Sequence, residues 1–304
     1  MNLIISVPLN VAIAESLGKK GTEGNLTFYN RVIDNNAIVV LFPTNIKNNI
    51  INVAESMLLS DLILISTSII DKTFGEVILA ASLTKKHIIF TDDNDIKEYI
   101  TSAKIKNFEI VSNDNILNTI INYSKLISTN SNNNLSRVDI DRAFTVKGIG
   151  NVALGFVTKG TIKVHDELYH NSGKKVIIKS IQSHDIDVDT AIPNMRVGLA
   201  LKGIDSNEIE KGDILLSKPF NKTTKILTRV VINSLEENKR KLSKGENYMF
   251  VSNFQHTNIV VDNINEAENT VDLLLNTPLY LESNDSFFLL QNKAPRIFAY
   301  GEVI

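Results

Sequence analysis

The chain contains no cysteine and no tryptophan in its 304 residues. The absence of cysteine excludes disulfides, thiolate metal sites and a cysteine nucleophile, and it is consistent with a reducing cytoplasm. There is also little net charge, since 32 Lys and Arg residues face 34 Asp and Glu residues. No overall positive field therefore attracts nucleic acid, and no DNA partner is expected.

Long apolar runs are missing as well. The longest, residues 53–70, is interrupted by two carboxylates and is too short to span a bilayer, so we expect a helix followed by a strand there. The apolar N-terminus lacks a basic leader and contains Pro8 and Asn10, which favours a buried first strand over a signal peptide. We therefore expect a cytoplasmic protein with no membrane partner.

Short apolar runs alternate with amphipathic stretches over residues 1–127. This alternation predicts a parallel sheet with crossover helices. The predicted strands are residues 3–7, 38–42, 62–66, 88–91 and 109–111, and the predicted helices are 50–59, 73–83, 95–103 and 115–126.

Residues 128–136 (STNSNNNLS) are small and polar, which predicts a linker. After them, short β-branched runs separated by turn signals such as Lys159-Gly160 predict a β-barrel over 137–219. A second β-rich stretch over 220–304 predicts another barrel. Its predicted strands are residues 225–232, 247–251, 258–265, 270–275 and 296–304.

The start of the first barrel carries a family motif. Residues 141–148 read Asp-Arg-Ala-Phe-Thr-Val-Lys-Gly and lead into Gly-Ile-Gly-Asn-Val-Ala-Leu-Gly at 148–155. This resembles domain 2 of the elongation factor Tu superfamily, where a strand leads into G-x-G-x-V-x-x-G. Further matches follow in order at residues 160–168, with His165 in place of the usual glycine, and at 176–184, 196–203 and 209–216. The resemblance implies a GTPase-like α/β domain followed by two β-barrels.

Within that superfamily the chain resembles the selenocysteine-specific elongation factor, whose domain 2 opens with D-R-x-F-x-V-K-G. The resemblance implies that Asp141, Arg142 and Arg196 line a pocket for a charged aminoacyl group, since guanidinium groups suit an anionic selenolate or carboxylate. It also places Lys211 where elongation factor Tu has an arginine against the tRNA 5′ phosphate. His184 borders this pocket by its position. Each residue also has a non-functional interpretation. Asp141 and Arg142 could form a surface ion pair, and Arg196 could be a solvated loop residue. Lys211 could be an ordinary turn lysine, and His184 a surface-loop histidine.

Glycines 148, 150 and 155 belong to the same motif. We interpret them as residues that determine the fold, because they allow a sharp turn and a close approach between strands.

The α/β domain departs from the family. A phosphate loop reads G-x-x-x-x-G-K-[ST], and residues 10–22 match this motif only in part. The candidate remnants of the loop are Gly18, Lys19, Lys20, Gly21 and Thr22. Of the D-x-P-G-H motif only Pro43 remains, and residues 91–95 do not match N-K-x-D. The domain is then either a degenerate GTPase scaffold or one whose residues 18–22 bind a nucleotide or phosphate in an unusual way.

These observations favour a translation-factor-like protein, a pseudo-GTPase that has lost GTP hydrolysis and binds tRNA, aminoacyl-tRNA or the ribosome. We expect no catalytic residues and no cofactor, and the five histidines have no metal-binding spacing. One alternative is a divergent GTPase that still binds GTP or GDP and acts as an elongation factor. Another is a regulatory paralogue that competes with an intact factor for the ribosome.

Overall fold

The computed structural model describes residues 2–33, 36–91, 95–126, 135–237 and 241–304. The chain divides into two compact units. The first unit combines Leu3–Leu126 with Thr223–Ile304, and the middle unit is Ile127–Lys222. Most of the predicted linker, residues 128–134, lies outside the described residues. Among the helices that the structure describes, none has the length and hydrophobicity needed to cross a membrane.

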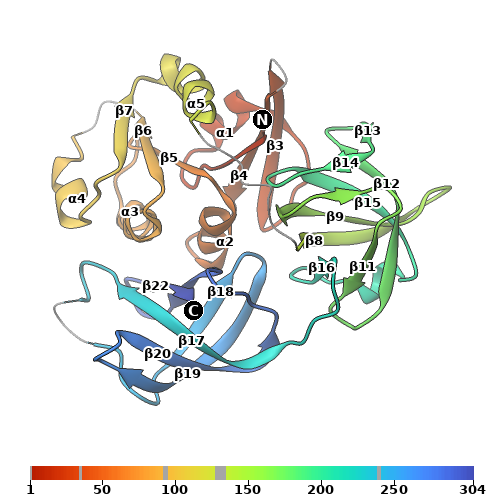
Figure 1. Cartoon of the computed structure of the whole chain (residues 1–304). Helices are drawn as coiled ribbons and strands as arrows, with labels where there is room; N and C mark the ends of the chain where they lie inside the picture. The colour runs from red at the N-terminus through yellow and green to blue at the C-terminus, as the bar shows by residue number, and fades with distance from the viewer. Residues whose placement is uncertain (1, 34–35, 92–94, 127–134, 238–240) are drawn as a thin grey trace. The chain divides into compact units, whose positions relative to one another are not determined.

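The first unit begins with a seven-stranded sheet in the order β2-β3-β4-β1-β5-β6-β7 (Figure 1). Strands β1, β5, β6 and β7 run parallel, as predicted, whereas β2 pairs antiparallel with β3 and β3 with β4. The sheet is therefore mixed, and the β3–β4 hairpin is an addition to the predicted pattern. The strands are β1 Asn2–Ser6, β2 Lys19–Lys20, β3 Leu26–Ile33, β4 Asn36–Pro43, β5 Leu62–Ser66, β6 His87–Thr91 and β7 Phe108–Val111.

Five helices connect these strands: α1 Val11–Leu17, α2 Ile51–Leu59, α3 Lys72–Thr84, α4 Lys97–Ser102 and α5 Ile116–Ser124. Helix α3 begins where the Asp71 side chain accepts a hydrogen bond from the Phe74 N–H. Lys86 caps the C-terminus of helix α2, because its amine donates hydrogen bonds to the carbonyls of Met57, Leu58 and Ser60. Burial lowers the pKa of Lys86 to about 8, so the amine is still mostly protonated at neutral pH.

The C-terminal part of the first unit is a closed barrel in the order β17-β20-β19-β18-β21-β22. Its strands are β17 Thr223–Ile232, β18 Asn247–Ser252, β19 Gln255–Asn265, β20 Thr270–Leu279, β21 Ser286–Leu290 and β22 Ile297–Val303. All were predicted except β21.

The barrel shares a hydrophobic core with the α/β sheet. Met57 of α2 and Phe74 of α3 belong to the same buried cluster as Phe288 of β21 and Ile297 of β22, and all four side chains are fully buried. Burial of this kind is the main favourable term in folding. We therefore treat the two parts as one cooperative body.

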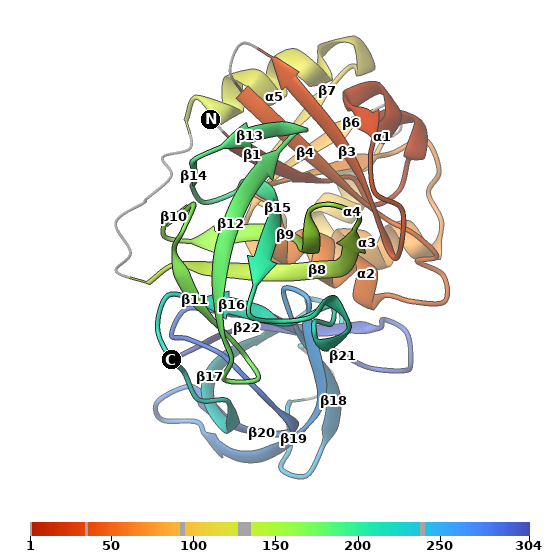
Figure 2. The ribbon, with the colours of Figure 1, turned by 90° about the vertical axis from the view of Figure 1, so that its right-hand side faces the viewer.

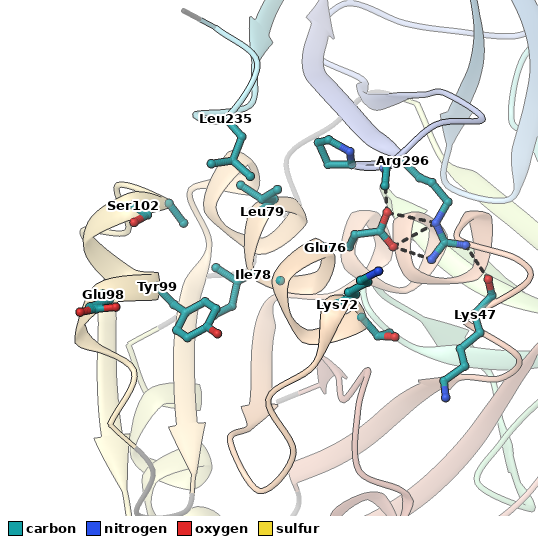
Figure 3. Close-up of a pocket in the computed structure, with 15 residues that line it drawn as sticks. Lys47, Lys72, Glu76, Ile78, Leu79, Glu98, Tyr99, Ser102, Leu235 and Arg296 are labelled. Carbon is teal, nitrogen blue, oxygen red and sulfur yellow. Dashed lines mark hydrogen bonds and ion pairs between the residues drawn. The ribbon is translucent and has the colours of Figure 1, made fainter. Parts of the chain in front are cut away.

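An ion pair reinforces the same junction (Figure 3). The Arg296 side chain, just before β22, contacts both carboxylate oxygens of Glu76 on α3, with Nε–Oε1 at 3.1 Å and Nη2–Oε2 at 2.5 Å. The Arg296 N–H donates to Glu76 Oε1 at 2.8 Å. Nη1 donates to the carbonyls of Ile46 and Lys47, at 3.2 and 2.9 Å. One side chain thus fastens the barrel to α3 and to the loop after β4.

The middle unit is also a barrel, with strands in the order β11-β16-β8-β9-β15-β12 and a β11–β12 pairing that closes it (Figure 2). The short strand β13 extends β12, and β10 pairs with β14. The strands are β8 Arg137–Val146, β9 Gly150–Lys159, β10 Ile162–Lys163, β11 Glu167–His170, β12 Lys175–Ser183, β13 Ile186–Val188, β14 Thr190–Ala191, β15 Arg196–Lys202 and β16 Ile214–Leu216.

The motif residues of this barrel have conformational roles. Gly148 and Gly150 have φ values of 85° and 105° in the hairpin between β8 and β9. At Gly155 an added Cβ would lie 2.3 Å from the Asp139 carbonyl oxygen, so only glycine fits. His165, which replaces the family's usual glycine, also has a positive φ, 73°. The interpretation of these glycines as fold-determining is therefore confirmed.

Candidate functional site

The three residues that the motif assigns to an aminoacyl pocket meet in the middle barrel. Asp141 and Arg142 lie on β8, which pairs with β9, and Arg196 begins β15 on the other side of β9. The register of β8 shifts between Ile140 and Arg142, and such a bulge re-aims the side chains beside it. Arg142 Nε lies 3.2 Å from Asp141 Oδ2, and Arg196 Nη2 lies 3.8 Å from the same oxygen. One carboxylate thus stands between two guanidinium groups.

This cluster carries one net positive charge close to the surface. The Arg142 side chain is 36% exposed, whereas Arg196 is 10% and Asp141 6% exposed. Burial lowers the pKa of Arg196 to about 10, the Asp141 carboxylate opposes this and Arg142 adds to it. Arg196 is still charged at neutral pH. It is a buried member of the barrel, so the alternative of a solvated loop arginine does not hold.

His184 lies beside this cluster. It stands in the turn between β12 and β13, where His184 and Asp185 both have positive φ, 51° and 61°. Ser183 Oγ donates to the Arg196 carbonyl at 2.9 Å, which ties this turn to the start of β15. Burial lowers the pKa of His184, the Arg196 charge lowers it further, and Asp185 opposes both. The imidazole is therefore neutral at pH 7 and offers one donor and one acceptor.

Lys211 belongs to a turn that packs on β8 next to Asp141. The Gly212 N–H donates to the Ile140 carbonyl at 3.0 Å, and the Ile140 N–H donates to the Asp213 carbonyl at 2.9 Å. These two bonds place the Lys211 backbone beside the cluster. The Lys211 side chain is half-buried.

Asp213 anchors this turn. Its carboxylate contacts His170 Nε2 at 3.0 Å and accepts a hydrogen bond from the Asn171 amide. Burial alone would raise the pKa of Asp213. Hydrogen bonds from His170, from the Glu210 N–H and from Asn171 outweigh burial and hold the pKa below its ordinary value. The sequence did not indicate this positioning role, because His170 and Asp213 are far apart in the chain and follow no spacing pattern.

The predicted phosphate-loop residues lie elsewhere. Gly18 follows α1, Lys19–Lys20 form β2, and the Gly21 N–H donates to the Phe28 carbonyl of β3. Thr22 comes next, so all five residues follow helix α1. A phosphate loop precedes its helix, because the helix N-terminus supplies the phosphate-binding N–H groups. Their position therefore does not support residues 18–22 as phosphate ligands.

The segment in the phosphate-loop position is residues 7–10, which contains neither glycine nor lysine. Asn10 Oδ1 accepts hydrogen bonds from the N–H groups of Ala12 and Ile13, at 3.0 and 3.3 Å. The first N–H groups of α1 are thus satisfied by the chain itself. Asn10 Nδ2 also donates to Ser66 Oγ at 3.3 Å, which joins the ends of β1 and β5.

The loop after β4, residues 44–50, contains no His, Cys, Asp or Glu. Thr44, which follows Pro43, donates its hydroxyl to the carbonyls of Gly24 and Asn25. Within the described ranges, no group of three or more His, Cys, Asp or Glu residues could hold a metal ion. Part of the third landmark, residues 92–94, lies outside those ranges. The residues that the structure describes do not fit a triphosphate with its magnesium ion.

Comparisons with known proteins agree with this fold. Residues 150–216 match the family model of elongation factor Tu domain 2. The uncharacterized protein MJ0325 of Methanocaldococcus jannaschii is 30% identical over 301 residues, which cover 96% of each chain. The selenocysteine-specific elongation factor of Haemophilus influenzae is 28% identical over 173 residues, which cover 55% of this chain and 28% of that protein.

Solved structures show the same architecture. Translation elongation factor SelB from Methanococcus maripaludis, in complex with a GTP analogue, superposes with a TM-score of 0.82 at 20% identity and covers 99% of this chain and 78% of its own. A bacterial selenocysteine-specific elongation factor gives a TM-score of 0.83 at 16% identity, with coverage of 99% and 58%. The chain therefore belongs to the same family as MJ0325 and to the translational GTPase superfamily, close to the selenocysteine-specific elongation factors.

Proposed function

We propose that this protein is a cytoplasmic, translation-factor-like protein that binds tRNA or aminoacyl-tRNA, or docks on the ribosome, without hydrolysing GTP. The observation that carries the proposal is the cluster of Asp141, Arg142 and Arg196. These residues match the family motif in sequence, and each guanidinium group lies within 4 Å of the Asp141 carboxylate in the barrel.

The chemistry of the cluster suits an anionic or hydrogen-bond-accepting aminoacyl group. Arg142 is accessible to such a ligand, Asp141 orients both guanidinium groups, and the neutral His184 adds a hydrogen-bonding group without a further charge. Charge-assisted bonds from arginine are stronger than neutral ones. Lys211, on the adjacent turn, supplies a positive charge for an RNA phosphate.

Two observations support the loss of hydrolysis. Phosphoryl transfer depends on positioning and on electrostatic stabilisation by lysine and Mg²⁺, and the β1–α1 loop supplies no lysine for the phosphates while the loop after β4 supplies no carboxylate for the metal. Nucleotide switches order and release loops as the γ-phosphate comes and goes. Here the loop after β4 is held by Arg296, and α2 is packed into the core shared with the barrel. Movement of either would disrupt that core.

Filter binding with charged and uncharged tRNA at low salt tests RNA binding. We expect saturable binding that weakens at least about tenfold in Arg142→Gln and in Arg196→Lys, since each loses a guanidinium fork. Lys163→Ala, on β10 of the same barrel, is the matched control and should bind like the wild type. The tRNA proposal fails if no saturable binding occurs, and co-sedimentation with ribosomal subunits then decides whether the ribosome is the partner.

A calorimetric titration with GTP and GDP in the presence of Mg²⁺ tests the alternative of a divergent GTPase. We expect no saturable heat with either nucleotide. Saturable binding with a preference between the two would establish the alternative, because a ligand shifts a switch only through different affinities for its two states.

A further inference from the structure

A groove in the first unit has no part in the proposed tRNA site. It lies between α3, α4 and the barrel segment before β22, and its volume is about 670 Å³ (Figure 3). Ligand pockets commonly have volumes of roughly 300–1,000 Å³ and are mostly apolar, with a few polar groups that orient the ligand. The apolar side chains in this groove come from both parts of the unit. They include Ile78, Leu79, Tyr99, Ala103, Leu235 and Pro295.

Two of these side chains are unusually exposed for their size. Leu235 is 44% exposed and Tyr99 38%, whereas Ile78 and Leu79 are buried and form the floor. Exposure of large apolar side chains around a concave floor is typical of a binding site. The Tyr99 ring packs edge-on against Phe74 at 5.3 Å, which fixes one wall.

The groove has opposite charges at its two ends. Lys72, the first residue of α3, lies toward Arg296, and Glu98 of α4 lies at the far end (Figure 3). Arg296 is already bound to Glu76 and to two carbonyls. Over the part of the chain that the structure describes, no carboxylate makes an ion pair with the Lys72 amine. Lys72 is therefore available to an anionic ligand, as is Lys47 at the same end of the groove, and Glu98 repels an anion from the opposite end.

Gly75 keeps this groove open. It is an interior residue of α3 that lines the groove, and a Cβ added there would meet no atom within 4 Å. A glycine inside a helix is unfavourable relative to alanine. At this position neither packing nor a positive φ requires glycine, so its visible effect is to leave the helix backbone uncovered on the groove side.

We propose that this groove binds a small molecule with an apolar body and a single anionic head group, such as a medium-chain carboxylate. The head group lies at Lys72, and the body packs on Ile78 and Leu79 between Tyr99 and Leu235. The charge of Glu98 sets the orientation. This site is independent of the tRNA cluster in the middle unit.

The test uses the full chain and two probes of equal length, decanoate and 1-decanol, below the concentrations at which they aggregate. Calorimetric titration should show saturable decanoate binding to the wild type. Gly75→Leu fills the groove from α3 and should weaken decanoate binding more than about tenfold. Gly75→Ala is the matched control and should bind decanoate like the wild type. Gly75→Ala should keep a thermal midpoint no lower than that of the wild type, because the new Cβ meets no neighbour, and the thermal midpoint of Gly75→Leu is measured alongside to confirm that this variant is folded.

Charge reversal at Lys72 distinguishes the contribution of the ligand's head group to binding from that of its apolar body. Lys72→Glu should weaken decanoate binding about tenfold and leave decanol binding unchanged, whereas Lys106→Glu, outside the groove, should change neither. Failure of decanoate to bind the wild type, or equal decanoate binding by the wild type and Gly75→Leu, would overturn the site. Equal weakening of both probes in Lys72→Glu would overturn the placement of the head group.

Discussion

Replacement of Arg296 by methionine should destabilise the whole first unit. The substitution keeps much of the apolar side chain but leaves the Glu76 carboxylate with only the Arg296 N–H as donor at this junction. Glu76 is 11% exposed and Arg296 19%. Removal of one partner from a buried ion pair costs about 3–5 kcal/mol. Because this pair keeps some contact with solvent, we expect a loss of about 3 kcal/mol, which corresponds to a fall of roughly 6–12 °C in the thermal midpoint of a unit of this size.

Scanning calorimetry of the full chain measures this loss, and hydrogen exchange of α3 assigns it to the first unit. Arg229→Met, at an exposed position on β17, is the matched control and should change stability by less than about 0.5 kcal/mol. The double variant Glu76→Gln/Arg296→Met should lose less than the sum of the single variants, since it leaves no lone buried charge. A loss below about 1 kcal/mol for Arg296→Met, or strict additivity, would refute the role of this pair.

Three further substitutions test the interior of each unit. Lys86→Met removes the donor of three carbonyls at the end of α2 and should cost about 2–4 kcal/mol, with faster hydrogen exchange in α2. Gly155→Ala forces a Cβ onto a backbone oxygen and should cost more in urea unfolding than Gly173→Ala, where φ is positive but nothing lies within 4 Å and about 1 kcal/mol is expected. Asp213 has a folded-state pKa below its ordinary 3.8, so its stabilisation is complete above that pH and is lost as the pH falls through the lower value. Asp213→Asn should therefore lower the thermal midpoint of the middle unit at pH 7 and have much less effect in strong acid.

Most elements of the fold could be predicted because their apolar runs have a clear period. Strand β3 was missed because Thr27, Asn30 and Arg31 interrupt its apolar pattern, and its place is set by pairing with β4. Strand β21 was missed because a run of five residues, mostly apolar, does not by itself distinguish a buried strand from a buried helix. Helix α1 was not predicted because residues 10–22, which contain it, were interpreted as the remnant of a phosphate loop.

The site could be predicted only where a motif marks it. Asp141, Arg142 and Arg196 were assigned through the family pattern, and in the structure both guanidinium groups lie within 4 Å of the Asp141 carboxylate, while their role as an aminoacyl pocket stays a prediction. His170–Asp213 and Glu76–Arg296 are contacts between residues far apart in the chain. Nothing in the local sequence around either partner indicates the other, because tertiary packing alone creates the contact.

The core shared by α2, α3 and the C-terminal barrel also affects how the chain is made. The apolar face of α3 ends at Thr84, but Ile297, which helps to cover it, is synthesised about 200 residues later. At a synthesis rate of about 5–20 residues per second, that face stays uncovered for roughly 10–40 s on each nascent chain. During translation the α/β domain therefore waits for strand β22, and in that interval its uncovered apolar face is available to a chaperone.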